Sequence, residues 1–431
     1  MFNARIYRSS GFRFSDEPGA THSDKLRGLV KFGPYRGIQG KPKIGFVFPE
    51  GYRDHANNLY LALRNGIGYF KGLGSWFRVP FEKDQVFPVT GFKLLNPHDD
   101  DDCAKRYRDA ILNWRTANPN NTPDVFLNLH PKSLAWEETS AYVASKAALL
   151  EAGIISQNVT FELMENAAQF EWAAANIALG LFVKLGGIPW ITDVTNPTGF
   201  VIIGMGRAEV QDPVSRERAR ITAFTTCVRE NGIYELTHVG QSQTTDDGFL
   251  NELKTSVKAA LLKALQVEPE LKGIVLHFPK DFARIERDAV AEVVSGFRQD
   301  RPLSFYTLKI SEEERFFAFD DSNQGIPPRG ACIKLDRNDF LLYTEGAEEK
   351  AAWANRLPTA VHIRQFGECD DVTKTDLVAQ AFDLSLVNYR GFNSKAFPIS
   401  IYYSELIANI LKRGKKLDLS AEILQTRMWF L

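Results

Sequence analysis

The stretch that decides the fold lies in residues 136–190 and reads WEETSAYVASKAALLEAG (136–153), IISQN (154–158) and then NIALGLFVKLGGIPW (176–190). In its first segment, Tyr142 and Lys146 are four residues apart. If that segment is helical, the two side chains project from one face, one above the other. The pattern predicts a helix that presents a phenol and an ammonium group together.

Two further polar side chains complete this set. Gln157 comes just after the first predicted helix, on the next connection or at the start of a strand. Lys184 lies in the last turn of a second predicted helix, which ends at a Gly-Gly pair. Two ammonium groups, a phenol and a carboxamide form a donor-rich set that suits a phosphate dianion. The residues alone also fit a half-buried tyrosine, a solvated lysine and a lysine that complements the helix dipole.

The wider sequence carries motifs that resemble a known family. The four polar residues above, followed by KLGGIPW, resemble the pocket that binds the guide 5′-phosphate in the MID domain of Argonaute proteins. More closely, the chain resembles short prokaryotic Argonautes, which consist of MID and PIWI domains. The similarity covers nearly the whole chain, through KLRGLVKFGPY (25–35), KLGGIPW (184–190), IIGMG (202–206), NYRGFNSKAFPISIYYSELIANI (388–410) and MWFL (428–431).

The resemblance implies further members of the phosphate pocket. In this family the C-terminal carboxylate reaches into the MID pocket, a role that Leu431 would take here. A divalent cation, which we expect to be Mg²⁺, would bridge that carboxylate and the guide phosphate, because two anions placed together need a countercharge. Asn176, two turns before Lys184, is an additional candidate for the pocket. Related proteins carry a metal-contacting glutamine one turn before the lysine, where this chain has Gly180.

The composition is that of a globular protein without a strong overall charge. The chain has 431 residues, 44% of them hydrophobic, and a formal net charge of −1, which allows two to four domains or lobes. Any nucleic-acid binding must therefore rely on a local basic channel. We expect a soluble, cytoplasmic protein, because the chain has neither a signal-peptide core nor an apolar run of membrane length. The cysteines lack paired spacing and are interpreted as buried small hydrophobic residues in a reducing cytoplasm: Cys103, Cys227, Cys332 and Cys369.

Strands and helices alternate from residue 41 to 195, which predicts a Rossmann-like open α/β sheet with ligands at the carboxyl ends of its strands. By the resemblance, residues 41–195 are the MID domain. Residues 1–40, with a strand or hairpin at 2–14, are too short for a core of their own and are expected to pack on the PIWI domain. The expected strands are 43–49, 75–81, 124–131 and a closing strand at 188–193, and the expected helices are 54–70, with Asp54 as its cap, 99–117 and the two in residues 136–190.

Residues 196–431 are expected to form the PIWI domain, which by resemblance has a ribonuclease-H-like fold. The predicted elements are a strand at 199–206, a hairpin at 219–240 that turns at Asn231-Gly232, a helix at 246–265, a strand at 273–279, a helix at 281–297, a strand at 303–310, further β segments at 332–336 and 339–346, and helices at 372–387 and 404–413.

The carboxylates of a cutting PIWI domain are missing from their expected positions. Two aspartates, a glutamate and a fourth ligand hold the two metal ions that such cleavage needs. In the family the first aspartate ends the opening strand, where this chain has Gly206, and the second follows a later strand, where it has Phe-Pro-Lys at 278–280. Asp281 lies nearby, but a lone carboxylate does not assemble a two-metal site. We therefore expect a protein that is not an enzyme, in keeping with the degenerate sites of short Argonautes.

Three other patterns have simpler explanations. The run Asp99–Asp102 cannot converge on one metal ion within a helical turn, whereas acids at a helix N-terminus favour the helix dipole. His277 and Asp281 could be written into a hydrolase triad, but no GxSxG elbow accompanies them. IIGMGRAEV has only two of the three glycines of a dinucleotide-binding loop.

A basic loop precedes the last long helix. Arg390, Asn393 and Lys395 lie in NYRGFNSKAF (388–397), where backbone donors with basic side chains suit phosphate oxygens. By the resemblance, these residues contact the first guide phosphates. A solvated basic loop explains the same residues equally well.

These features together predict a guide-binding protein that does not cut. We expect it to bind a 5′-phosphorylated short guide, RNA rather than DNA, and to recognise complementary target DNA through base pairing. The resemblance implies that pairing is signalled to a partner effector protein with an APAZ-type domain, in defence against plasmids or phage. Two alternatives stay open: a guided nuclease whose metal ligands lie elsewhere, and a homodimeric guided DNA-binding protein that needs no effector.

Overall fold

The computed structural model describes residues 3–133, 140–194, 197–211, 218–240, 243, 245–279, 283–298, 302–313, 316, 318–321, 325–346, 358–413 and 422–431. The chain forms two compact units. Unit 1 comprises Met1–Phe12, Ile191–Asn388 and Asn393–Asn409, and unit 2 comprises Arg13–Trp190, Tyr389–Phe392 and Ile410–Leu431. The units are interleaved along the chain, whereas the predicted domains are continuous.

Unit 2 is built on a parallel sheet. Among its described residues the strands lie in the order β5 (Val86–Val89), β4 (Ile44–Val47), β6 (Val125–His130) and β7 (Ile155–Thr160). Neighbouring strands run parallel, and β4 and β6 are buried along their whole length. Parallel strands that are buried in this way need helices on both faces of the sheet. The arrangement confirms the predicted Rossmann-like α/β fold.

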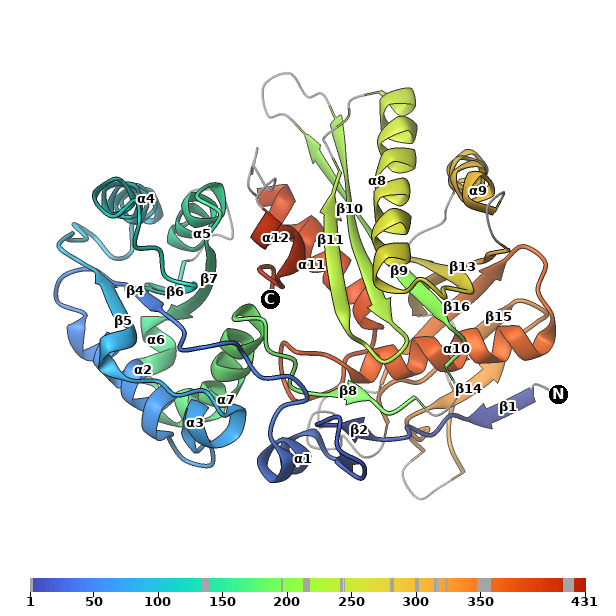
Figure 1. Cartoon of the computed structure of the whole chain (residues 1–431), viewed down its shortest axis with the longest axis horizontal. Coiled ribbons are helices and arrows are strands. Elements are labelled where there is room, and N and C mark those ends of the chain that lie inside the picture. Colours follow the sequence, from blue (N-terminus) through green and yellow to red (C-terminus); the bar gives the residue numbers. More distant parts are fainter. Residues whose placement is uncertain are drawn as a thin grey trace. The chain divides into compact units, whose positions relative to one another are not determined.

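Helices connect the strands of unit 2 (Figure 1). They are α2 (Arg53–Asn65), α3 (Gly72–Phe77), the short 3₁₀ helix η1 (Lys83–Gln85), α4 (Asp100–Ala117), α5 (Ala141–Glu151), α6 (Phe161–Glu165) and α7 (Ala167–Lys184). Asp99, Ser140 and Asn166 cap α4, α5 and α7, since each side chain accepts a first-turn backbone N–H at 3.1–3.2 Å. Helices α5 and α7 both pack on β7, which places the predicted phosphate-binding residues around one strand.

Three expectations for this region are wrong. Residues 75–81 do not form a strand, because α3 covers the first of them and ends at Arg78, whose φ of 59° is left-handed. Tyr52 rather than Asp54 occupies the N-cap of α2. Finally, β8 (Ile191–Thr192) does not close the sheet, since it lies outside the four strands found among the described residues of unit 2.

Unit 1 contains one large mixed sheet. Within its described residues the strand order is β1 (Asn3–Ile6), β14 (Ala331–Lys334), β15 (Asp339–Leu342), β16 (Ala360–Phe366), β13 (Ser304–Glu313), β12 (Gly273–Phe278), β9 (Phe200–Gln211), β10 (Arg218–Arg229) and β11 (Tyr234–Val239). Strands β9, β12 and β13 are parallel, and β9, β10 and β11 form an antiparallel meander. This topology confirms the predicted ribonuclease-H-like order of elements.

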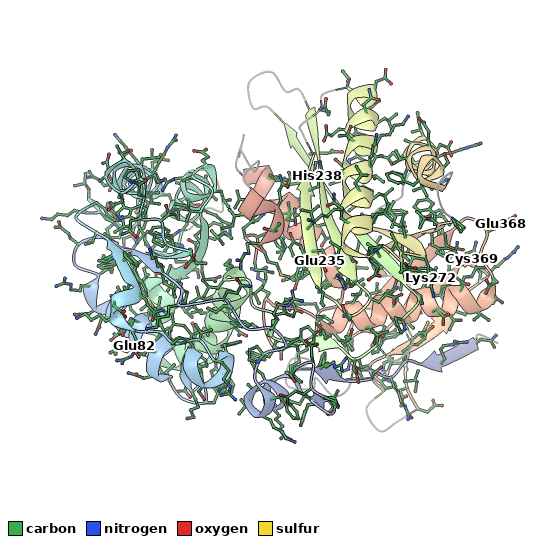
Figure 2. The ribbon with its side chains drawn as sticks, in the orientation of Figure 1. Glu82, Glu235, His238, Lys272, Glu368 and Cys369 are labelled. Atoms are coloured by element: carbon green, nitrogen blue, oxygen red, sulfur yellow. The ribbon has the colours of Figure 1, made fainter. Side chains whose placement is uncertain are left out.

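The hairpin between β10 and β11 turns where the sequence predicts it. Gly232 follows Asn231 and has a φ of 87°, which favours glycine. Across the hairpin, Arg229 Nε donates to Glu235 at 2.8 Å. Glu235 and His238 both lie on β11 (Figure 2). The turn therefore pairs β10 with β11 at one end of the strand order.

Four helices accompany this sheet: α8 (Asp246–Val267), α9 (Arg284–Arg298), α10 (Asp371–Leu386) and α11 (Ile399–Arg413). The side chains of β9 at positions 201, 203 and 205 join a core with α8 and α9. Successive residues of a strand face opposite sides, so Gly204 and Gly206 face the other way. There a Cβ at Gly204 would overlap the main-chain oxygen of Ser400, and one at Gly206 would overlap that of Ser404. The backbone of α11 therefore lies directly on β9.

The N-terminal segment is divided between the units. Residues 1–12 belong to unit 1, where β1 pairs with β14 rather than with β2 (Phe12–Arg13). Residues 13–40 belong to unit 2 and contain β3 (Thr21–His22) and α1 (Lys25–Phe32). The predicted strand at 2–14 is thus present as two short pieces.

Two general expectations can be compared with the structure. Cys103 and Cys332 are buried, and burial raises the pKa of their thiols to about 11 and about 12. Cys369 is only half-buried, so the expectation of a buried side chain is wrong there. Cys227 belongs to the residues whose side chains lie outside the description. Among the described residues, no helix combines the length and the apolar character needed to cross a membrane.

The close approach of α11 to β9 makes a prediction for stability. Gly204→Ala should lower the free energy of unfolding by about 1–3 kcal/mol, because the added methyl group must displace the backbone at Ser400. Gly296→Ala, in helix α9, is the matched control, since a Cβ there meets no atom within 4 Å. That control should stabilise the protein by about 0.5–1 kcal/mol through helix propensity. Urea unfolding of both variants measures the difference, and equal effects would contradict the packing described.

Candidate functional site

The first predicted lysine is buried in unit 2. Lys146 lies in α5, one position after Ser145, and only 3% of its surface is exposed. Its Nζ donates a hydrogen bond to the main-chain oxygen of Trp429 at 2.9 Å. Helix α5 therefore directs this ammonium group inward, toward the end of the chain.

The second predicted lysine meets two other predicted residues. Lys184, the last residue of α7, is 1% exposed. Its Nζ donates to Oε1 of Gln157, in β7, and to the main-chain oxygen of Leu431. The structure thus brings Lys184, Gln157 and Leu431 into direct contact, and it places Lys146 beside them through Trp429.

The cluster brings two buried lysine amino groups close to each other and to the charge of Arg390. Burial, followed by the charge of Arg390, lowers the pKa of Lys146 to about 7. Burial lowers the pKa of Lys184 well below its ordinary value, and the charges of Lys146 and Arg390 lower it further. Among the described residues neither lysine pairs with an aspartate or glutamate. Since buried charges are normally paired, the site is suited to an anionic ligand.

The last residues of the chain form one wall of the cluster. After α12 (Glu422–Thr426), Trp429 is fully buried and Phe430 nearly so. The guanidinium of Arg427 occupies the space that a Cβ at Gly186 would fill, and Gly186 has a φ of 92°. A side chain at position 186 would therefore be excluded both by backbone strain and by volume. The glycine that ends α7 makes room for the C-terminal segment.

Tyr142 lies on the same helix as Lys146, one turn earlier, and is half-buried. Its ring packs edge-on against His130, with centroids 6.1 Å apart. His130 is buried at the end of β6, and burial lowers its pKa. The neutral imidazole bonds the main-chain oxygen of Pro131 at 2.8 Å through Nδ1. Tyr142 therefore stands at the carboxyl end of β6, beside the lysine cluster.

The two other predicted positions on α7 differ in their surroundings. Asn176 is exposed, and its Oδ1 would lie 3.3 Å from a Cβ at Gly391. Gly180 lies between Asn176 and Lys184, and a Cβ there would come within 3.1 Å of Gln157 Oε1. The absence of a side chain at position 180 therefore leaves room for Gln157 to reach Lys184. Asn176 is placed beside the basic loop and not in the buried cluster.

The basic loop is split between the units. Arg390 belongs to unit 2, where Phe392 packs against the rings of Trp76 and Trp190 at 5.8 and 5.5 Å. The hydroxyl of Tyr389 donates to Trp190 O at 2.6 Å. These contacts on both sides hold Arg390 close enough to lower the pKa of both lysines. The resemblance implies a contact of Arg390 with the guide backbone, whereas in the structure its charge acts on Lys146 and Lys184.

Asn393 and Lys395 belong to unit 1. Asn393 is exposed. The backbone N–H of Lys395 donates to Ser385 O at 3.4 Å, and its ammonium lies 5.8 Å from the centroid of the Tyr402 ring. Their contact with guide phosphates stays a prediction.

Gly206 and Phe278, which lie where the resemblance led us to expect catalytic carboxylates, belong to unit 1. Gly206 in β9 and the end of β12 are neighbours, because Gly204 pairs with His277 in the parallel register. His277 is fully buried, bonds Ser400 Oγ at 2.8 Å, and has a pKa lowered by burial to about 3. A fully enclosed histidine that bonds a serine of α11 fits a packing role better than a hydrolase triad. Lys280 and Asp281 lie outside the described residues.

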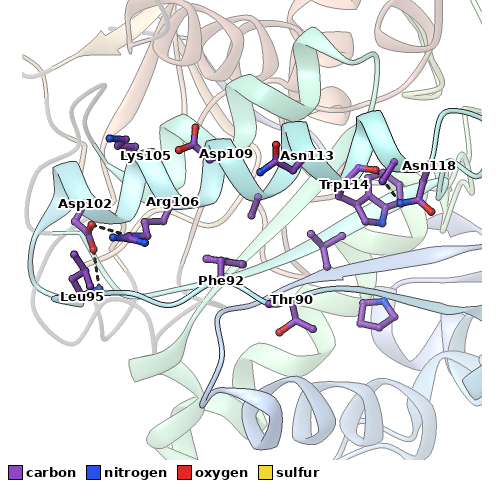
Figure 3. A pocket seen from close by; sticks show the side chains of 15 residues that line it. Thr90, Phe92, Leu95, Asp102, Lys105, Arg106, Asp109, Asn113, Trp114 and Asn118 are labelled. Atoms are coloured by element: carbon purple, nitrogen blue, oxygen red, sulfur yellow. Dashed lines mark hydrogen bonds and ion pairs between the residues drawn. The ribbon is translucent and has the colours of Figure 1, made fainter.

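A groove of about 750 Å³ lies elsewhere in unit 2, between β5 and α4 (Figure 3). None of the predicted site residues lines it. At one end Asp102 accepts hydrogen bonds from Arg106 Nε and from the backbone N–H of Leu95, both at 2.9 Å. Asp99 accepts from the Asp102 N–H as the helix cap. These contacts confirm that the acidic run Asp99–Asp102 serves the start of a helix.

Sequence reasoning missed two parts of the cluster. The carbonyl of Trp429 is a hydrogen-bond acceptor for Lys146, although MWFL was singled out for its last residue only. Arg390 belongs to the same electrostatic site as the two lysines. The run of aromatic residues around Arg390 was the available signal, because such residues anchor a loop against a core.

The chain is similar in sequence to proteins of one family. The sequence matches the Piwi domain family over residues 134–416. It is 22% identical, over 428 residues, to the argonaute protein of Cereibacter sphaeroides, covering 93% of this chain and 55% of that protein. It is 23% identical, over 320 residues, to the Piwi protein of Archaeoglobus fulgidus, covering 68% of this chain and 72% of that protein.

Two solved structures share the fold. Clostridium butyricum Argonaute, bound to a guide DNA and a 19-mer target DNA, superposes with a TM-score of 0.69 at 16% identity, over 96% of this chain and 54% of that one. Drosophila Piwi superposes with a TM-score of 0.71 at 16% identity, over 99% and 56%. The chain spans about half the length of these proteins and of the Cereibacter sphaeroides relative. Because the Piwi match covers more than half of its residues, the chain belongs to the Piwi-domain family of Argonaute proteins.

Proposed function

We propose that this chain binds the 5′-phosphorylated end of a short guide strand and uses the guide to recognise complementary nucleic acid. The observation that carries the proposal is the pair of buried lysines, Lys146 and Lys184, which share one cluster, have pKa values lowered by burial, and pair with no aspartate or glutamate among the described residues. A terminal phosphate carries about two negative charges and three acceptor oxygens. It would accept hydrogen bonds from both ammonium groups and restore their charge.

The neighbouring groups suit the rest of a strand end. Arg390 adds a guanidinium, which binds phosphate oxygens well. Tyr142 offers an aromatic face and a hydroxyl at the rim of the cluster, and Asn176 lies on the side of α7 that meets the basic loop. Gln157 orients Lys184. We assign Asn393 and Lys395 to the guide backbone beyond this end.

Mg²⁺ is proposed as the bridge between the guide phosphate and the carboxylate of Leu431. The donor set fits this ion, because Mg²⁺ is commonly held by one or two carboxylates together with phosphate oxygens. When bound, it would supply positive charge between two anions. Because burial lowers the pKa of Lys184, this lysine supplies little positive charge of its own, and a countercharge is still needed. The Leu431 oxygen already accepts a hydrogen bond from Lys184.

We further propose that the chain does not cut its target. Gly206 stands where the first catalytic aspartate is expected, and a Cβ there would overlap the main-chain oxygen of Ser404. Helix α11 fills the space that a carboxylate at this position needs.

A guided protein without a cutting site must report pairing in another way. We propose that a guide, RNA in preference to DNA, pairs with target DNA, and that a partner effector with an APAZ-type domain receives the signal. Defence against plasmids or phage is the proposed context. The absence of a carboxylate at Gly206 supports a role in which this chain recognises the target and the partner acts on it. A homodimeric guided DNA-binding protein without an effector is the alternative.

Removing the two lysines tests the phosphate site. Lys146→Ala combined with Lys184→Ala should weaken binding of a 5′-phosphorylated guide by at least about 100-fold, because two charge-assisted hydrogen bonds are lost. Binding of the same strand with a 5′-hydroxyl should change little. Lys105→Ala, in the groove between β5 and α4, is the control for general charge. Fluorescence anisotropy with and without EDTA measures both the phosphate preference and its dependence on Mg²⁺. Equal losses for both strand ends would contradict the proposal.

The low lysine pKa values make a prediction for pH. Above about pH 7 the free protein has lost the Lys146 proton, and the bound phosphate restores it, so binding takes up a proton. Affinity for the phosphorylated guide should therefore fall as pH rises from 7 to 9, by up to about tenfold per unit for each lysine. Lys146→Arg should flatten the profile, since arginine stays charged. A wild-type profile that is flat over this range would exclude a titrating lysine.

Cleavage assays test the non-cutting assignment. Purified protein, a phosphorylated guide and a complementary target should give no product with Mn²⁺ or Mg²⁺. Gly206→Asp should also give none, because the carboxylate collides with α11 at Ser404. Gel analysis over several hours is sufficient. A discrete product at a fixed guide position from the wild-type chain would establish a nuclease instead.

A further inference from the structure

Helix α7 carries an exposed tryptophan that the phosphate cluster does not use. Trp172 is 69% exposed. Its ring leans on that of Tyr69, with centroids 5.1 Å apart, and the Tyr69 hydroxyl donates to the Trp172 main-chain oxygen at 3.3 Å. Tyr69 packs in turn on the buried Trp76, at 5.8 Å. A large ring supported from behind and open to solvent is a preformed contact surface.

Trp172 belongs to the same row of α7 side chains, spaced four residues apart, as Lys184 of the cluster. Trp172, Asn176, Gly180 and Lys184 follow one another at intervals of four residues. Such residues form a ridge that runs along the helix at an angle to its axis. The ridge passes from buried Lys184 to exposed Asn176, beside Gly391, and then to Trp172. Lys184 and Trp172 are separated by about 18 Å of helix axis.

That separation matches a short piece of single strand. Stacked nucleotides advance about 3.4 Å each, so about five nucleotides span the ridge. A strand whose 5′-phosphate lies at Lys184 and whose backbone passes Asn176 would bring a later base to Trp172. From Lys184 toward Trp172, this ridge of α7 therefore carries a cationic group, then the polar Asn176, and then an aromatic ring.

The chemistry at Trp172 favours a base over a phosphate. Glu171 precedes it, and the charge of Glu171 contributes to the raised pKa of Tyr69, after burial. The carboxylate of Glu171 also occupies the space next to Gly68. A negative charge there disfavours phosphate oxygens, whereas aromatic faces stack on any base.

We propose that Trp172, supported by Tyr69, is a stacking surface for a nucleobase of the bound guide strand, about five nucleotides from its phosphorylated end. This inference rests on the proposed function, because the phosphate at Lys184 sets the register. It adds a contact that does not involve the phosphate. It also predicts that affinity depends on the length of the guide.

A length series tests the surface directly. The affinities of 5′-phosphorylated oligonucleotides of two to twelve nucleotides are measured with wild-type protein and with Trp172→Ala. Strands too short to reach the ridge end should bind both proteins equally. Longer strands should lose about 5- to 150-fold on removal of the ring. Trp172→Phe should retain most of the affinity, because phenylalanine also offers an aromatic face.

An abasic scan identifies the partner base. A single abasic site, moved along a twelve-nucleotide guide, should weaken wild-type binding most near the fifth position. The same site should have no extra effect in Trp172→Ala, since the stacking partner is then already absent. Leu112→Ala removes an exposed apolar side chain from α4 and should leave every affinity unchanged.

The outcomes separate this inference from the proposed function. An unchanged affinity of Trp172→Ala at all lengths overturns the stacking surface, and so does an equal loss for the shortest and longest strands. Lys184→Ala, measured beside it, reports on the phosphate site through the preference for a phosphorylated end. A length-dependent loss in Trp172→Ala without any phosphate preference in the wild type would overturn the proposed function and leave the base contact standing.

Discussion

The constraint on which unit 2 depends is the burial of two lysine side chains, Lys146 and Lys184, in one cluster. The ammonium group of Lys184 sits between Gln157 Oε1 and the main-chain oxygen of Leu431, and that of Lys146 bonds Trp429 O. Neutral or partly charged acceptors offset only part of the cost of burying an ammonium group. The lowered pKa of both lysines is the visible consequence. An arrangement that is costly without an anion becomes favourable with one, which is the physical reason for proposing a phosphate as its ligand.

Most of the fold could be predicted from the sequence because its signals are local. Alternating strands and helices gave both sheets, and the Asn231-Gly232 turn needed only a residue that tolerates positive φ. The segment at 75–81 failed for a tertiary reason. Its aromatic residues favour a strand, yet Trp76 and Phe77 are buried from a short helix that ends at left-handed Arg78. Packing against other aromatic rings outweighed the local preference.

The site was less accessible to sequence reasoning because its contacts span great distances along the chain. The spacing of Tyr142 and Lys146 on one helix is a local pattern, whereas the residues joined by the hydrogen bond from Lys146 to Trp429 are 283 positions apart. The residues joined by the bond from Lys184 to Leu431 are 247 positions apart. Family resemblance supplied the second of these contacts, and neither periodicity nor composition could have done so. Arg390 was recognised as basic, but its place beside the lysines follows from aromatic anchors that only the folded chain reveals.

In unit 1 the close packing of a helix on a strand depends on two glycines. Gly204 and Gly206 have no side chains on one face of β9, so the backbone of α11 can lie directly on the strand. The Ser404 hydroxyl donates to the main-chain oxygens of Ser400 and Ile401, at 2.9 Å each. The hydrogen-bond donor at this contact is therefore paired within α11. The space beside Gly204 and Gly206 is filled by the backbone of α11, so these glycines serve packing, and a carboxylate side chain at either position would require the helix to move.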